Sequence, residues 1–71
     1  MASEHEKLLG KWCVEKNAKV DVWRHPTGRW YAIEIIWSFE PVIPAAGRTR
    51  ALAMKRMWET LVECRLAKEE S

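Results

Sequence analysis

The fold of this chain is decided by residues 30–39, which read WYAIEIIWSF. Every odd position from Tyr31 to Phe39 is apolar, whereas the even positions mix apolar and polar residues. A period of two in a run rich in aromatic and β-branched side chains predicts a β-strand with one buried face. We therefore expect a small core to be built against this strand.

A second strand is predicted just before the first. Residues 20–23, VDVW, alternate in the same way, and the RHPTGR that follows holds Pro and Gly at positions typical of a reverse turn. A register slip of one residue between the two strands would bury Asp21. The pattern therefore determines which side chains face the core, and only slips of two residues remain possible. The simplest register pairs Trp23 with Trp30 across a two-residue turn at residues 26–27, with both indoles on the outer face.

A helix is predicted on each side of the strands. Over residues 4–16 the apolar side chains form one helical stripe, with Ser3 as the N-cap. A longer stripe follows over residues 49–68, with Thr49 as the N-cap. The two prolines of residues 40–44 restrict that segment to a turn and a short edge strand.

These elements predict a single α+β domain over residues 1–71, with frayed ends at 1–3 and 69–71. The order is helix, β-hairpin, short third strand, helix, and the two helices pack on one face of an antiparallel sheet. A chain of 71 residues is too short for a second core. Of five tryptophans, the three on the apolar faces are expected in the core: Trp12, Trp37 and Trp58.

The composition excludes several classes of protein. An apolar content of 48% is too high for a disordered chain, and a formal charge of +2 is only mildly basic. No apolar run is long enough to span a membrane, and the first six residues are acidic where a signal peptide would be basic and then apolar. We expect a cytoplasmic protein in which Cys13 and Cys64 are reduced, half-buried thiols.

The sequence offers no set of catalytic residues. Its two histidines and three serines are scattered over different elements, and its three glycines form no phosphate loop. Cys13, Cys64, His5 and His25 match no zinc spacing. We therefore expect a non-enzymatic binding protein with no metal and no cofactor.

The start of the last helix is unusually basic. Arg48 and Arg50 flank the predicted N-cap, and Lys55 and Arg56 follow within two turns. A helix N-terminus carries about half a positive charge, so acidic residues are the stabilising choice there. Arginines in their place, beside exposed backbone N–H groups, indicate a site for a phosphate or carboxylate.

The hairpin supplies a second candidate surface. The turn is flanked by Arg24 and Arg29, and Trp23 and Trp30 are predicted to lie side by side on the outer sheet face. Indoles beside arginines suit base stacking, cation–π contacts or a hot spot for a protein partner.

The predicted order of elements, with Gly47-Arg48-Thr49-Arg50 at the start of the last helix, resembles the double-stranded RNA-binding domain. In that family the helix start contacts phosphates across the major groove, while the first helix and first hairpin loop contact the minor groove. Ala51 and Met54 stand where the family carries further lysines. The Gly-x-Thr helix start also looks like that of the antitoxin partners of HicA-type toxins and of the arm-binding domains of tyrosine integrases.

Two functions remain open on the sequence alone. The first is binding of duplex RNA or DNA through Arg48, Arg50, Lys55 and Arg56 with the hairpin turn. The second is a protein-binding inhibitor or regulator, such as a phage-encoded anti-CRISPR protein or an antitoxin, that acts through the tryptophans and arginines. Association into a homodimer, through the tryptophan face or a sheet edge, is a further expectation.

Overall fold

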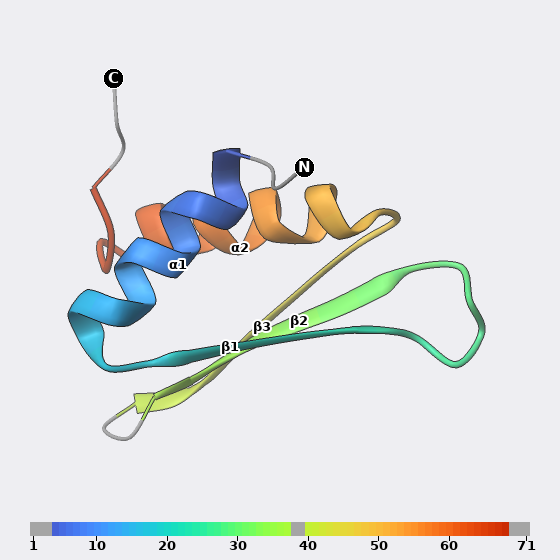
Figure 1. The fold of residues 1–71 in the computed structure, drawn as a ribbon, viewed down its shortest axis with the longest axis horizontal. Coiled ribbons are helices and arrows are strands. Elements are labelled where there is room, and N and C mark those ends of the chain that lie inside the picture. The colour runs from blue at the N-terminus through green and yellow to red at the C-terminus, as the bar shows by residue number, and fades with distance from the viewer. Residues whose placement is uncertain (1–3, 38–39, 69–71) are drawn as a thin grey trace.

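The computed structural model describes residues 4–37 and 40–68 of the chain (Figure 1). The elements follow in the order α1 (Glu4–Lys16), β1 (Lys19–Arg24), β2 (Tyr31–Trp37), β3 (Glu40–Gly47) and α2 (Arg50–Glu63). The strands form one antiparallel sheet in the order β1-β2-β3, and both helices lie on the same side of it. The predicted α+β architecture is confirmed.

The core is built on the central strand, β2. Ile33 and Ile35 are 1% and 0% exposed, as the odd-position pattern predicts. Trp12 of α1 is also buried, and its ring meets that of Trp37 edge to face, with centroids 5.3 Å apart and planes at 78°. The other core residues are Leu9 and Cys13 of α1 and Ala53, Met54, Met57 and Leu61 of α2.

The predicted pairing of Trp23 with Trp30 is wrong by two residues. Trp23 pairs with Ala32, and the partner of Trp30 is His25, whose N–H donates to the Trp30 carbonyl over 2.9 Å. The turn is longer than predicted because the Gly28 N–H donates to the His25 carbonyl and Gly28 has a φ of 75°. This four-residue loop, with Gly in the left-handed region, replaces a two-residue turn for which Pro26 is unsuited. Because side chains alternate between the two sheet faces, a register shift of two residues leaves each side chain of the hairpin on its predicted face.

The third strand is longer than the segment predicted over residues 40–44. Residues 45–47, expected to lead into the helix, continue β3 and pair with the first residues of β2. The strand tolerates Pro41 and Pro44 because it lies at the edge, where a proline nitrogen can face solvent. A β-bulge in the same segment also accommodates them. Ile35 pairs with Ile43 and Trp37 with Glu40, so β3 holds one more residue than β2 between these two pairs.

The junction between β3 and α2 is tightly packed. A Cβ on Gly47 would lie 2.5 Å from the Ala53 backbone nitrogen, closer than real atoms approach. Thr49 is the N-cap, as predicted, and its Oγ1 accepts a 3.0 Å hydrogen bond from the Leu52 N–H. The last strand and last helix therefore meet backbone to backbone, and only glycine fits the contact.

Both helices end in the same hydrogen-bond pattern. In α2, Arg65 has a φ of 60°, its N–H donates to Val62, and the Leu66 N–H donates to Leu61. In α1, Asn17 has a φ of 53° and the two bonds recur from the N–H groups of Asn17 and Ala18 to the carbonyls of Val14 and Cys13. These are Schellman motifs, each with a non-glycine residue in the left-handed position.

The Schellman motif ends α2 at Glu63, so the predicted helix to residue 68 is five residues too long. The chain turns back because Leu66 and Ala67 pack against the core. The Trp12 indole N–H donates to the Leu66 carbonyl over 2.9 Å, which satisfies a buried donor. A helix continued through residue 68 would forgo that bond.

Some sequence predictions lie outside the described residues: the Ser3 cap, the place of Phe39, and the frayed ends at 1–3 and 69–71. Within the described part, neither helix has the length and apolar character needed to cross a membrane.

We predict opposite effects for two glycine-to-alanine substitutions. Gly47→Ala should lower the free energy of unfolding by about 2–4 kcal/mol, because the new methyl overlaps the α2 backbone. Gly10→Ala, in an exposed helix position with no heavy atom within 4 Å of the new Cβ, should raise it by about 1 kcal/mol. Urea unfolding measures both, and equal tolerance at the two positions would contradict the junction geometry.

A second prediction concerns the end of α2. Arg65→Gly should raise the free energy of unfolding by about 0.5–1 kcal/mol, because glycine adopts a positive φ without the Cβ clash. Asn17→Gly is the matched control and should give a smaller gain, since asparagine already tolerates this conformation. A loss of stability in Arg65→Gly would show that its side chain contributes more than its backbone strain removes.

Candidate nucleic-acid interface

The sheet register brings the two basic segments to one end of the molecule. Arg24, the last residue of β1, pairs with Tyr31 of β2, and Tyr31 pairs with Gly47, the last residue of β3. The hairpin turn and the start of α2 therefore leave the sheet from the same row of residues, at the right of Figure 1. We call this surface the basic end: Arg24, Arg29, Arg48, Arg50, Lys55 and Arg56.

Three cations of the basic end are free to meet a ligand. Arg29, Arg48 and Lys55 are exposed, and none has a hydrogen bond or ion pair to a residue in 4–37 or 40–68. Arg48 precedes the N-cap and Lys55 lies on α2. Their charges therefore come from three positions of the chain: the hairpin turn, the residue before the cap, and α2.

The other three cations are held by the protein itself. Arg24 donates to the Gly28 carbonyl at 3.3 Å from Nε and 3.1 Å from Nη2, which braces the turn. Arg56 donates to the Ala46 carbonyl over 3.1 Å. Arg50 forms an ion pair of 2.8 Å with Glu6 of α1. All three remain exposed, so they add positive potential as well as positioning.

The Arg50–Glu6 pair changes the electrostatics of the helix start. The first turn of α2 holds no acidic residue, as the sequence indicates. Glu6 instead reaches it from α1, where acids also stabilise the first turn of that helix. An exposed pair of this kind contributes at most about 1 kcal/mol. Arg48, on the other side of the cap, forms no ion pair with residues 4–37 or 40–68.

The tryptophans do not form the predicted adjacent pair. Trp30 instead stacks on His25, with ring centroids 4.1 Å apart and planes at 18°. The Thr27 N–H donates to His25 Nδ1 over 3.3 Å, which holds the imidazole in this orientation. Trp23 lies two residues before His25 on the outer sheet face and is 42% exposed. This stack was not predicted from the sequence, because the expected register placed Trp23, and not His25, opposite Trp30.

The outer sheet face, opposite the helices, is partly apolar. Among the side chains that the structure describes, its large exposed apolar residues are Trp23 and Ile36, at 42% and 45%. Between them, Asp21 and Glu34 pair directly across β1 and β2. Like charges in that position repel each other, so nearby cations are stabilising. Lys19, which pairs with Ile36 in the next row of this face, is one such cation.

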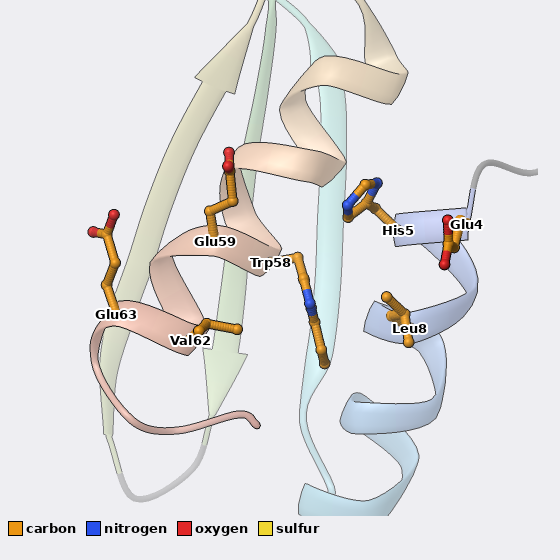
Figure 2. Close-up of a pocket in the computed structure, with 7 residues that line it drawn as sticks. All are labelled: Glu4, His5, Leu8, Trp58, Glu59, Val62 and Glu63. Atoms are coloured by element: carbon orange, nitrogen blue, oxygen red, sulfur yellow. The ribbon is translucent and has the colours of Figure 1, made fainter. Parts of the chain in front are cut away.

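A groove runs between α1 and α2 (Figure 2). Trp58 reaches from α2 toward α1, where Leu8 lies, and these two residues line both of the hollows that make up the groove. The hollows have volumes of ≈ 380 and ≈ 420 Å³. Trp58 was predicted in the core; it packs against the core but is only partly buried.

The described residues hold no cluster of three or more potential metal ligands. Both cysteines are free, but neither is half-buried as expected: Cys13 is buried and Cys64 is exposed. Burial raises the pKa of the Cys13 thiol, which keeps it protonated and unreactive. Cys13 therefore serves as a core residue.

Comparison of the chain with protein-family models, curated proteins and solved structures finds no match. The candidate functional surfaces of the molecule are the basic end, the outer sheet face and the α1–α2 groove.

The exposure of Trp23 leads to a prediction about stability. Trp23→Ala should lower the free energy of unfolding by less than about 1.5 kcal/mol, because much of the indole already contacts water. Trp12→Ala is the comparison, and its loss should be about 3 kcal/mol or more because that ring is buried. Thermal or urea unfolding measures both. A comparable loss at the two positions would remove Trp23 as a binding surface.

Proposed function

We propose that this protein binds duplex nucleic acid through the basic end. The observation that carries the proposal is the pairing of Arg24 with Tyr31 and of Tyr31 with Gly47. This row places the hairpin turn and the start of α2 two strand spacings apart, which is about 10 Å. The grooves of B-DNA have a similar width, about 6–12 Å, so in this proposal cations at the two sites contact phosphates on the two sides of one groove.

In this proposal some cations contact phosphates and the others position the site. Arg48 and Lys55 contact phosphates from α2, and Arg29 contacts them from the hairpin turn. Arg48 adjoins the N-cap of α2, where free backbone N–H groups and the helix dipole also favour an anion. Arg24, Arg50 and Arg56 shape the site and strengthen its field. The contacts are to the backbone, so the proposal implies little base specificity.

The resemblance to the double-stranded RNA-binding domain supports a duplex ligand over a single strand. The elements occur in the order that the resemblance implies, with both helices on one sheet face. This chain differs from the family at Met54, where the family carries a lysine. Met54 is a buried core residue of α2, and a lysine would be unfavourable there. Lys55, one position further, is exposed and supplies a cation instead.

The test is a mobility-shift titration with duplexes of about 20 base pairs of RNA and DNA at two salt concentrations. Wild-type binding should weaken steeply with salt, because each phosphate contact releases a counterion. Arg48→Glu/Lys55→Glu should reduce affinity by about tenfold or more, since two attractions become repulsions. The fold should be retained, because neither side chain has a hydrogen bond or ion pair within the described part of the chain.

The matched control is Lys16→Glu/Lys19→Glu, which changes the net charge equally. These residues lie where α1 passes into β1, at the opposite end of the molecule in Figure 1. The control should bind nearly as wild type. Absence of duplex binding at low salt, or equal losses in both double variants, would reject the basic end as the binding site.

The outer sheet face supports a second candidate function, inhibition or regulation of a protein partner. The observation behind it is the Asp21–Glu34 pair between the exposed side chains of Trp23 and Ile36. Such a surface suits a partner that inserts an arginine or lysine beside an indole. Failure of the duplex assay would make this face the next one to test.

A further inference from the structure

The α1–α2 groove is divided into two halves of opposite charge. Its acidic half is lined by Glu4, His5, Glu59 and Glu63, which supply three carboxylates and no lysine or arginine. Its basic half is lined by Lys11, Lys16, Arg65 and Lys68, and Glu15 is the one carboxylate among the described residues that line it. Leu8 and Trp58 line both halves and therefore lie at the middle of the groove.

We propose that the α1–α2 groove is the interface of a symmetric homodimer. A two-fold axis that crosses the groove at its middle, perpendicular to its length, would place the acidic half of one copy on the basic half of the other. It would also bring the two Trp58 side chains to the centre. Closed two-fold dimers need such a self-complementary surface, and a central aromatic residue ringed by polar groups is typical of an interface hot spot.

The charge pattern favours a second copy over other occupants. A nucleic acid would be repelled by Glu4, Glu59 and Glu63, and a uniformly basic partner by the opposite half. The chain itself supplies both signs in nearly equal number at the spacing that the groove requires. These side chains are also exposed, and the one ion pair between described residues, Arg50–Glu6, lies outside the groove.

The proposal does not depend on duplex binding, because the groove and the basic end share no residue. Sedimentation equilibrium without nucleic acid tests it directly. Over a concentration series at low salt, the mean mass should rise from 8.3 kDa toward twice that value. Added salt should shift the equilibrium back to monomer, because it screens the charge pairs. A wild type that stays monomeric throughout would overturn the proposal.

A charge-swap experiment locates the interface. Glu59→Lys/Glu63→Lys makes both halves of the groove basic, and Lys11→Glu/Lys68→Glu makes both predominantly acidic. Each variant alone should show a dissociation constant raised about tenfold or more, because like charges now face each other. An equimolar mixture should restore association as a heterodimer, which native mass spectrometry distinguishes from either homodimer.

The control is Lys7→Glu/Lys19→Glu, which equals the second variant in charge change but substitutes exposed residues outside the groove. It should keep the wild-type dissociation constant, with circular dichroism confirming the fold of every variant. Should a double variant unfold, the single changes Glu63→Lys and Lys68→Glu, at and beyond the end of α2, repeat the test. A mixture that stays monomeric, or a control that weakens association equally, would place the contact elsewhere.

Discussion

The buried face of β2 is the constraint on which the rest of the structure depends. Ile33 and Ile35 are almost fully enclosed, and a strand with one buried face must keep its alternation. That alternation allows β1 to slide only in steps of two. The observed register differs from the simplest one by such a step, so Val20 and Val22 still face the core while Trp23 remains outside. A shift of one residue would have reversed every face.

Two contacts between distant segments close the helical layer over this strand. Gly47 lets the end of β3 meet the α2 backbone, which determines where that helix begins relative to the sheet. Trp12 of α1 donates its indole hydrogen to the Leu66 carbonyl, which fixes where the chain turns back after α2. The left-handed conformation of Arg65 is unfavourable by about 1 kcal/mol on its own, and the packing of Leu66 and Ala67 offsets it.

The same arrangement separates the charges of a chain that is nearly neutral. Hydrogen-bonded rows across the sheet collect the arginines of the hairpin and of α2 at one end. The packing of α1 beside α2 gathers most of the groove's carboxylates in one half and its lysines in the other. The net charge of +2 therefore indicates neither the positive charge of the basic end nor the opposite charges of the two halves of the groove. Duplex binding at the basic end and self-association through the groove are compatible, because each uses its own residues.

The sequence alone determined the element types and their order, because alternation in residues 30–39 and helical stripes on either side leave few other ways to bury apolar side chains. It also determined the Thr49 cap and which residues of the hairpin face outward. It did not determine the hairpin register, since a two-residue shift keeps the same faces, nor the end of α2, since Arg65 carries no local signal for a positive φ. The Arg50–Glu6 ion pair and the oppositely charged halves of the α1–α2 groove depend on residues far apart in the chain. The His25–Trp30 stack depends on the hairpin register. Only the tertiary structure decided these features, because each is a contact between surfaces whose relative placement no local pattern encodes.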